Sequence, residues 1–404
     1  MSSIRQNQKI LIGITAGIAA YKVPLLVRLF IKSGAEVRVL MTPAAKDFVT
    51  PLTLSTLSKH PVVSSFYDEE DENAVWNNHV ELGLWADLMV IAPATANTMS
   101  KMASGTSDNL LIATYLSAKC PVYVVPAMDL DMYKHPSTHE TFKKLRAFGN
   151  IIIPAETGEL ASGLTGQGRM AEPETIFNFI REDILKGLPL HGKKVLITAG
   201  PTYEAIDPVR FIGNHSSGKM GIALAQRAAD LGAEVDLILG PSSLEIDHSL
   251  IKIHRITTAE EMFQEVSSLF DSCHIAIAAA AVSDYRPKNA ASQKIKKSVS
   301  EFTLDLEKTI DILEWMGGQK KEQFLVGFAL ETENELENAK KKRIRKNLDL
   351  IVLNSLNDKG AGFKKDTNKV SIINHNHEVK TFSLKDKSEV AEDIFNEINL
   401  RKNA

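Results

Sequence analysis

The sequence has few cysteines, no long apolar run and no excess of charge of either sign. Only two of its 404 residues are cysteines, Cys120 and Cys273, which is too few for a disulfide framework or a zinc site built from cysteines. Lys and Arg number 47 against 50 Asp and Glu. Because general binders of nucleic acid or membrane surfaces carry a basic excess, we expect neither kind of partner. We expect a protein of the reducing cytoplasm.

The distribution of apolar residues along the sequence also predicts no membrane-spanning helix. No apolar stretch reaches the roughly 20 residues that such a helix needs. The run Ile10–Ala20 imitates the apolar core of a signal peptide, but Thr15 and two glycines interrupt it and Lys22 follows at once. A strand that turns into a helix explains this run better.

The sequence does have enough apolar residues for large cores. Hydrophobic residues make up 44% and charged residues 24% of the chain, and its length suggests two to three domains at about 150 residues each. Short apolar runs alternate with helical patterns, which is typical of doubly wound α/β domains. Buried parallel strands are predicted at Ile10–Ile14, Val37–Leu40, Leu88–Ile91, Val122–Val125 and Ile151–Ile153, with helices at Ala19–Ile31, Asp108–Ala118 and Ser137–Phe148.

The alternation breaks at residues 186–192, which are rich in Gly and Pro, and then starts again. A domain boundary is therefore predicted here, with domains at residues 1–190 and 191–404. Both are predicted to be Rossmann-like, and the first flavodoxin-like. The second half is predicted to contain strands at Val195–Thr198, Val235–Leu239, Ile275–Ala279, Phe324–Ala329 and Leu350–Leu353, a hairpin at Val370–Ile373 and Val379–Leu384, and a terminal helix from about Asp386 to Leu400.

Two loops of the first half are placed to bind a ligand. Residues 13–17 (GITAG) follow the first strand and open a helix, where small residues let backbone N–H groups approach a phosphate. They do not match GxGxxG, so a mononucleotide or a plain turn remains open. Residues 92–98 (APATANT) follow another strand end, where ligands of parallel sheets bind. Their Thr and Asn side chains either contact a flavin or cap a helix.

Three further features of this half are ambiguous by themselves. A lone histidine such as His79 is usually structural. Residues 126–133 (PAMDLDMY) contain two Asp that suit a metal, a turn or a substrate. Residues 158–170 (GELASGLTGQGRM) contain four glycines, which suggests either a lid that excludes water or a plain flexible loop.

In this order, GITAGIAAYK, HVELGLWADLMVIAPATANT, PAMDLDMY and GELASGLTGQGRMAEP resemble the flavin-dependent phosphopantothenoylcysteine decarboxylases. The resemblance implies that FMN oxidises the substrate thiol to a thioaldehyde, that carbon dioxide then leaves, and that reduced flavin returns hydride. It implies that His79 is catalytic and that Asp129 and Met132 contact the substrate. It places FMN on Thr15, Ala16, Gly17, Thr42, Ala94, Thr95, Asn97 and Thr98.

Two residues depart from that family's pattern. Asp129 stands where the family has an Asn that contacts the substrate carboxylate, and an ionised Asp would repel that group. Asp129 is therefore protonated, or the contact differs. Ser162 stands where the family has a lid Cys that donates a proton in the reductive step, and a hydroxyl is far less acidic than a thiol. Neither cysteine of the chain is an obvious substitute, so the proton donor stays open.

The second half contains a near match to a phosphate-binding loop. Residues 213–219 (GNHSSGK) have the spacing GxxxxGK, but Met220 follows where Ser or Thr would hold magnesium. We therefore reject the P-loop, although the Asn214 amide can still serve a phosphate or an oxyanion. Asp284 follows a predicted strand and suits a ribose, magnesium or a turn. The basic run 340–346 is either a solvated helix face or lets lysines one turn apart reach a triphosphate.

The motifs ITAGPTYEAIDPVRFIGNHSSGKMG, AAAVSDYRP, KIKK, GFALETE and KKRIRKNLDLIVLN resemble the bacterial, CTP-dependent phosphopantothenate–cysteine ligases, and residues 9–400 resemble the bifunctional coenzyme A biosynthesis proteins. In that family the carboxylate of 4'-phosphopantothenate attacks CTP, and L-cysteine then displaces CMP. The resemblance implies that Asn214, Arg210 and Lys294 serve the reaction, and that magnesium accompanies CTP, with Asp284 as its possible ligand. It places CTP on Asp284, Lys294, Ile310, Asp311, Ile312, Leu313, Phe328, Lys342 and Lys346, although Ile310 replaces a proline of the family.

The resemblance also implies a homo-oligomer, with trimeric flavin domains and dimeric ligase domains. Two other hypotheses remain open. In one, only the ligase works, because Asp129 and Ser162 disable the flavin half. In the other, the protein is a flavin-binding regulatory module that acts through protein contacts. The choice of CTP over ATP rests on the resemblance alone.

Overall fold

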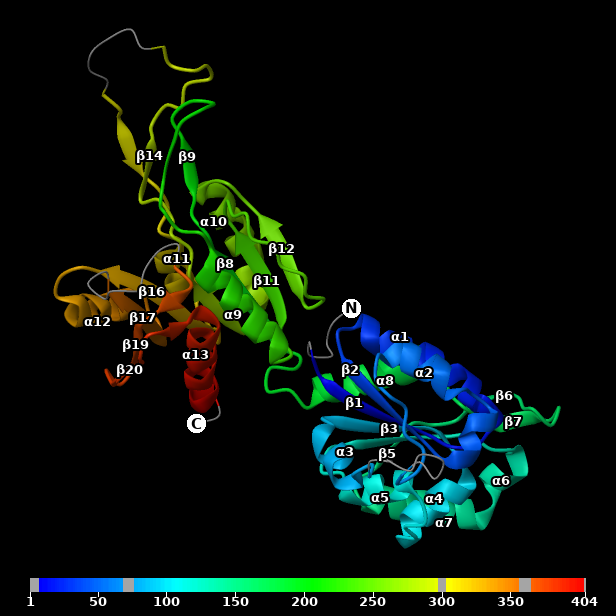
Figure 1. Cartoon of the computed structure of the whole chain (residues 1–404). Helices are drawn as coiled ribbons and strands as arrows, with labels where there is room; N and C mark the ends of the chain where they lie inside the picture. The colour runs from blue at the N-terminus through cyan, green and yellow to red at the C-terminus, as the bar shows by residue number, and fades with distance from the viewer. Residues whose placement is uncertain (1–6, 68–75, 297–302, 356–364, 403–404) are drawn as a thin grey trace. The chain divides into compact units, whose positions relative to one another are not determined.

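The chain forms two compact units, Met1–Leu185 and Lys186–Ala404. The computed structural model (Figure 1) describes residues 7–67, 76–296, 303–355 and 365–402. The boundary lies slightly before the expected break at 190/191. The reason is that Leu190 is buried in the core of the second unit and its backbone N–H donates to the carbonyl of Leu231 at 2.8 Å.

The first unit is built on a five-stranded parallel sheet of order β2-β1-β3-β4-β5. This order is flavodoxin-like, and its switch point lies between β1 and β3. Every residue of β3 is buried, as expected for a strand that helices cover on both faces. The strands are β1 Lys9–Ile14, β2 Glu36–Met41, β3 Leu88–Ala94, β4 Val122–Pro126 and β5 Ile151–Ile152.

Helices cover both faces of this sheet, and successive residues of β1 point to opposite sides. Ile10 and Ile12 pack with α1 and α8, whereas Leu11 packs with α4, α5 and α7. The helix predicted at Ala19–Ile31 is in two parts, because Pro24 lacks an N–H and starts a new helix near its N-terminus. The helical elements are η1 Ile18–Lys22, α1 Val23–Lys32, η2 Pro43–Asp47, α2 Pro51–Ser58, α3 His79–Trp85, α4 Ala96–Ser104, α5 Leu110–Ser117, α6 Leu130–Lys134, α7 Pro136–Ala147 and α8 Pro173–Lys186.

The second unit contains an eight-stranded sheet of order β12-β11-β8-β13-β16-β17-β19-β20. The strands from β12 to β17 are parallel, and their switch point lies between β8 and β13. The predicted hairpin adds β19 and β20 antiparallel to the edge, so this sheet is mixed. Its strands are β8 Lys194–Ala199, β11 Glu234–Leu239, β12 Ile251–Arg255, β13 Ile275–Ala278, β16 Phe324–Glu331, β17 Leu350–Ser355, β19 Val370–Asn374 and β20 Val379–Thr381. The prediction of two doubly wound α/β domains is confirmed.

Two helices cover one face of the second sheet and three cover the other. Leu224 of α9 and Phe395 of α13 lie in one core, and Met262 of α10, Met316 of α11 and Ala339 of α12 lie in the other. The helices are α9 Lys219–Asp230, α10 Ala259–Leu269, η3 Phe270–Ser272, α11 Ile312–Gln319, α12 Glu335–Arg345 and α13 Lys387–Lys402. Across the described residues of both units, no helix combines the length and the apolar character needed to cross a membrane.

Short antiparallel ribbons extend from both units. In the second unit, the β9–β10 and β14–β15 ribbons rise from the same end of the sheet (Figure 1). In the first unit, β6 and β7 form a hairpin where the sequence suggested a glycine-rich loop. The ribbon strands are β6 Glu156–Glu159, β7 Thr165–Arg169, β9 Tyr203–Ala205, β10 Phe211–Gly213, β14 Tyr285–Pro287 and β15 Leu306–Lys308, and a further small pair joins β18 Thr367–Asn368 to β21 Lys385–Asp386.

Candidate active sites

A cavity of about 530 Å³ lies beyond the carboxyl ends of the strands of the first unit, next to the switch point between β1 and β3. Loops that follow β1, β2, β3 and β4 all contribute to its wall. Of the residues predicted to bind FMN or substrate, Ala16, Thr42, Thr95, Asn97, Thr98 and Met132 line it, and Pro43, Ala44, Ala96, Lys101, Asn109, Ala127 and Met128 complete the wall. The sequence analysis missed Lys101 and Asn109, which lie beyond the APATANT motif.

Thr15 joins the loops after β1 and β3 and lies behind the cavity wall. Its hydroxyl donates to the Pro93 carbonyl at 2.6 Å and accepts from the Thr95 N–H at 3.1 Å. Thr95 in turn caps α4 by accepting from the Thr98 N–H. Thr15 is thus a structural link, and neither it, Gly17 nor Ala94 is among the lining residues.

Thr42 supports the presence of a ligand in this cavity. Its hydroxyl oxygen is buried and has no hydrogen-bond partner in the described part of the chain, although Thr42 lines the cavity. Buried polar groups are nearly always hydrogen-bonded, because an unsatisfied one carries a desolvation penalty. A planar ligand with polar edges, such as a flavin, fits a wall of Ala and Met side chains with a few hydroxyl and amide groups.

His79 lies outside the residues that line this cavity, at the start of α3. Asn78 caps that helix by accepting from the N–H groups of Val80 and Glu81 at 3.0 and 3.4 Å. The His79 ring lies edge-on to Phe66, with centroids 5.9 Å apart, and its Nδ1 is buried and has no hydrogen-bond partner among the described residues.

The two residues that depart from the family pattern also lie outside the lining. Asp129 accepts from the Leu130 N–H at 2.6 Å and so caps the short helix α6. Ser162 is exposed in the turn of the β6–β7 hairpin. The base of this hairpin packs tightly on the loop before α6. A Cβ on Gly168, whose φ is +146°, would lie 2.4 Å from the Met128 carbonyl oxygen, so a glycine is required there.

Neither cysteine can replace the missing lid thiol from where it lies. Cys120 precedes β4 (Val122–Pro126), at the amino ends of the parallel strands, whereas the cavity lies at their carboxyl ends. Burial raises the pKa of its thiol. Cys273 is buried in the core of the second unit.

The second unit contains a cavity of about 590 Å³ next to the switch point between β8 and β13. It gathers most of the predicted nucleotide residues from segments far apart in sequence. These are Asp284, Ile310, Asp311, Ile312, Leu313, Phe328, Lys342 and Lys346, and the cavity is also lined by Arg345 and Lys308, which the sequence analysis did not single out. Lys294 is exposed and is not among the lining residues.

Two lysines that line this cavity make close polar contacts: Lys342 on α12 and Lys346 directly after this helix. The Lys346 ammonium lies 2.8 and 2.5 Å from the two carboxylate oxygens of Asp311. Burial alone would raise the pKa of Asp311, but hydrogen bonds from Lys346 and from the Glu314 N–H hold it below its usual value. Lys342 donates to the Phe328 carbonyl at 2.9 Å. Burial and the nearby charge of Lys346 lower the pKa of Lys342.

Backbone hydrogen bonds fix Asp284 at the cavity wall while its side chain stays exposed. Its carbonyl accepts from the Thr309 N–H at 3.0 Å, and the Thr309 hydroxyl donates to the Ser283 carbonyl at 2.6 Å. Among the residues that the structure describes, no group of three or more His, Cys, Asp or Glu could hold a metal ion.

Asn214 and Arg210 lie on the β9–β10 ribbon and hold neighbouring loops. The Asn214 amide donates to the carbonyls of Ala281 and Val282 at 3.0 and 3.2 Å, and Val282 lines the cavity. Arg210 pairs with Asp207 and donates to the Ile295 carbonyl at 2.9 Å. Ile295 follows Lys294, so this arginine helps to position the segment that carries the lysine.

Asp207, which the sequence analysis missed, contacts both Arg210 and the backbone of Ile295. Its side chain is buried and accepts from the N–H groups of Val209, Arg210 and Ile295 at 2.9 to 3.1 Å. The hydrogen bond from the Arg210 side chain, together with these backbone N–H groups, lowers the pKa of Asp207. The lysine of the GxxxxGK match, Lys219, pairs with Asp366 at 2.5 Å, in agreement with the rejection of a P-loop.

Comparisons with known proteins identify the family. A family described as "Flavoprotein" matches residues 2–185, and one described as "DNA/pantothenate metabolism flavoprotein C-terminal domain" matches residues 190–400. The coenzyme A biosynthesis bifunctional proteins of Bacillus subtilis and Haemophilus influenzae are 42% and 44% identical to the chain, in each case over 97% of both sequences. The chain belongs to this family of bifunctional coenzyme A biosynthesis proteins. It is a flavoprotein and an enzyme with a decarboxylase half and a ligase half.

A further relative has a different name. A "Cysteine/Cysteine sulfinic acid decarboxylase" from an unknown prokaryotic organism is 52% identical over 355 residues, which are 87% of this chain and 98% of the relative. The alignment is therefore long enough to extend into both halves. The predictions of the family, the fold and a ligase–decarboxylase pair are confirmed, and the roles of single residues stay predictions.

Proposed function

We propose that the second unit uses CTP to join 4'-phosphopantothenate to L-cysteine, and that the first unit uses FMN to convert the product into 4'-phosphopantetheine. One observation carries the proposal. Each unit has a cavity next to the switch point of its parallel sheet, where ligands of such folds bind. One cavity is lined by several cations, and the other has a mostly uncharged wall.

The cavity of the second unit suits a nucleoside triphosphate. Lys342, Arg345 and Lys346 line it together, and clustered cations of this kind bind phosphate oxygens. Lys346 would exchange the Asp311 carboxylate for a phosphate. Magnesium binds mainly through substrate phosphates and one or two carboxylates, and the exposed carboxylate of Asp284 is available for that purpose.

The ligase reaction needs charge stabilisation at two steps. The pantothenate carboxylate attacks the α-phosphorus and expels pyrophosphate, and the cysteine amine then attacks the acyl carbon, loses a proton and expels CMP. Lys294 would neutralise the charge that develops on the phosphates. The Asn214 amide is held at the cavity wall by its hydrogen bonds to the Ala281 and Val282 carbonyls, and it would exchange one of these two bonds to donate to the acyl oxygen.

The cavity of the first unit suits FMN. The unpartnered hydroxyl of Thr42 and the Asn97 side chain offer polar contacts to the ring system or ribityl chain. The glycine turn at Gly17 and the N-terminus of α4 offer backbone N–H groups to the phosphate. When bound, FMN would take two electrons from the substrate thiol and return them after carbon dioxide has left. The free Nδ1 of His79 would accept the thiol proton.

A turnover assay with separate products tests this proposal. Purified protein is expected to be yellow, to form CMP from 4'-phosphopantothenate, L-cysteine and CTP with magnesium, and then to release carbon dioxide. ATP in place of CTP is expected to be a poor substrate. Equal rates with ATP would refute the choice of CTP. A colourless protein that forms no CMP would refute the proposal as a whole.

A second substrate class for the first unit is favoured by Asp129. Phosphopantothenoylcysteine has an amide nitrogen next to its carboxylate, whereas free cysteine and cysteine sulfinic acid have an ammonium group. A carboxylate side chain repels the first arrangement and attracts the second. The relative that is 52% identical has a name that refers to these two amino acids. We therefore propose that the first unit also decarboxylates free L-cysteine, whose thiol the flavin would oxidise in the same way, and cysteine sulfinic acid serves as a comparison because it has no thiol.

Carbon dioxide release from L-cysteine, cysteine sulfinic acid and phosphopantothenoylcysteine tests this second activity. Asp129→Asn is expected to lower kcat/KM for L-cysteine at least tenfold relative to that for phosphopantothenoylcysteine. Asn also caps a helix well, so α6 should remain folded. An unchanged ratio of the two kcat/KM values would rule out a role of Asp129 in this choice.

We also propose that the protein acts in the cytoplasm as a homo-oligomer, with trimeric first units and dimeric second units. Exposed apolar side chains on packed helices support self-association of the first unit. Val80 and Leu84 lie one turn apart on α3, and Leu116 lies on α5, with exposed fractions of 43%, 55% and 50%. Sedimentation equilibrium of the full chain tests this, and a strictly monomeric protein would refute it.

A further inference from the structure

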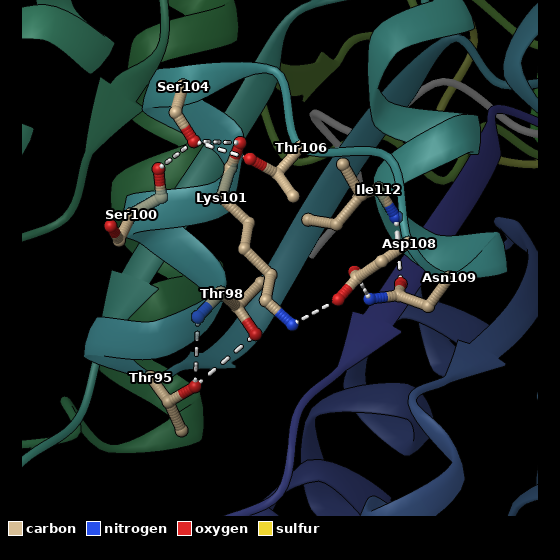
Figure 2. A network of polar contacts seen from close by, with 9 residues as sticks. All are labelled: Thr95, Thr98, Ser100, Lys101, Ser104, Thr106, Asp108, Asn109 and Ile112. Atoms are coloured by element: carbon tan, nitrogen blue, oxygen red, sulfur yellow. Dashed lines mark hydrogen bonds and ion pairs between the residues drawn. The ribbon is translucent and has the colours of Figure 1, made fainter.

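Lys101 is the only charged side chain among the described residues that line the cavity of the first unit. It lies on α4, one turn after Thr98, and the two side chains share a face of the helix (Figure 2). The other lining residues carry hydroxyl, amide or apolar side chains. FMN is an anion, so this cation in the cavity wall would attract part of the cofactor, and the question is which part.

Asp108 holds the ammonium group of Lys101. The two groups lie 2.5 Å apart, with side-chain exposures of 27% for Lys101 and 46% for Asp108. The Asn109 amide donates to the second carboxylate oxygen of Asp108 at 2.8 Å. The hydrogen bond from Lys101 is the largest cause of a lowered pKa of Asp108. Asp108 therefore orients the ammonium group of Lys101.

The turn after α4 fixes the position of Asp108. The carbonyl of Lys101 accepts from the N–H of Thr106 at 3.1 Å, and the carbonyl of Thr106 accepts from the N–H of Asp108 at 3.1 Å. Asn109 then caps α5 by accepting from the Ile112 N–H at 3.1 Å (Figure 2). The end of α4 and the start of α5 thus form one hydrogen-bonded frame around the ion pair.

The position of Lys101 along α4 indicates which part of FMN it faces. Phosphate groups bind at helix N-termini, and α4 begins at Ala96. Lys101 is five residues further on, which is about 7.5 Å along the axis at 1.5 Å per residue. If the phosphate binds at the start of α4 and the cofactor extends along the helix, its flat ring lies toward Lys101.

Resting on the proposed function, we propose that Lys101 faces the flavin ring and stabilises the negative charge that the ring gains on reduction. The substrate carbon gives a hydride to the ring, and the thiol gives a proton to a base, so a carbon–sulfur double bond forms. The ring thereby gains two electrons and one hydrogen and carries one negative charge. A cation near the ring favours this reduced state and raises the reduction potential.

The midpoint potential of the bound flavin, measured against a reference dye, tests the proposal. Lys101→Met is expected to lower the ratio of reduced to oxidised flavin at a given ambient potential at least tenfold, which corresponds to about 30 mV for a two-electron couple. Lys101→Arg keeps the charge and is expected to stay within threefold of the wild type. The matched control is Lys143→Met, which removes the lysine of an exposed ion pair with Glu140 at 2.7 Å and should leave the potential unchanged.

Affinity for FMN and for riboflavin separates this role from a contact with the phosphate. If Lys101 bound the phosphate, Lys101→Met would weaken FMN binding but not riboflavin binding, and the potential would not change. That result overturns the inference and leaves the proposed function intact. Wild-type protein that binds no flavin would overturn both. If Lys101→Met does not fold, as judged by circular dichroism, Lys101→Gln gives the same comparison.

Discussion

The ammonium of Lys346 lies 2.8 and 2.5 Å from the two carboxylate oxygens of Asp311, and both residues line the cavity of the second unit. Asp311 would therefore compete with a phosphate for the ammonium group of Lys346. Lys346→Met is expected to weaken binding of a non-hydrolysable CTP analogue by about 10- to 100-fold, because a hydrogen bond to a charged group contributes about 1.5–3 kcal/mol. Isothermal titration calorimetry measures this.

Asp311→Asn is expected to act in the opposite direction. It removes the competing charge but keeps a side-chain oxygen that can cap α11, so affinity for the CTP analogue should rise several-fold. Lys321→Met is a suitable control, because Lys321 forms an exposed ion pair with Asp271 and is not among the lining residues. Weaker binding by Asp311→Asn would show that Asp311 positions Lys346 and does not compete for it.

The lowered pKa of Lys342 predicts a pH dependence of nucleotide binding. Burial and the charge of Lys346 favour the neutral amine, so Lys342 loses its proton at a lower pH than an exposed lysine. A triphosphate prefers the protonated form, and KM for CTP should therefore rise as the pH passes upward through this lowered pKa. In Lys346→Met the rise should move to higher pH, because a repelling charge is gone. A KM profile that does not move would contradict this.

Thr42→Val is expected to have opposite effects on stability and on flavin binding. Removing a buried hydroxyl that has no partner should leave the free protein as stable as the wild type or more so. Loss of one hydrogen bond to FMN should weaken binding by about 1 kcal/mol, or roughly fivefold. Thermal unfolding and fluorescence titration measure the two effects. Thr141→Val, which changes an exposed hydroxyl on α7, should alter neither.

Ser162→Cys tests whether the Ser that replaces the family's lid Cys in the β6–β7 hairpin slows the reaction. If Ser162 occupies the position of the proton donor, a thiol there should speed the reductive half of the reaction, because it is much more acidic than a hydroxyl. Rapid-mixing measurements of flavin reoxidation follow this step. Since Ser162 is exposed, the substitution should not change stability. An unchanged rate would mean that a different group donates the proton.

Most strands of the two sheets were predictable because they are short, continuous apolar runs. The edge strand β12 was not predicted, because apolar and polar residues alternate along it. β3 is buried along its whole length, and such strands show clearly in a sequence. The β9–β10 and β14–β15 ribbons gave no such signal. Each of their strands has three residues, and they are held by side chains such as Asp207 from outside the strands.

The candidate sites were predictable only in part, because a motif does not say which of its side chains face the ligand. Thr15 belongs to the glycine turn, yet its hydroxyl serves the loop after β3. Lys101 reaches the cavity of the first unit but lies just beyond the motif that the sequence analysis selected, and Arg345 lines the cavity of the second unit from within a selected motif in which only Lys342 and Lys346 were named. Lys294, which lies within such a motif, is outside the cavity that it is predicted to serve.

The hydroxyl of Thr15 has a consequence for how a cofactor enters the first unit. One oxygen atom both donates to Pro93 and accepts from Thr95, and so cross-links two walls of the cavity without any ligand. The cavity is therefore preorganised, so that the binding of a flavin would order little additional backbone. Insertion of the cofactor should then resemble docking onto a rigid receptor, with an association rate set mainly by diffusion and orientation.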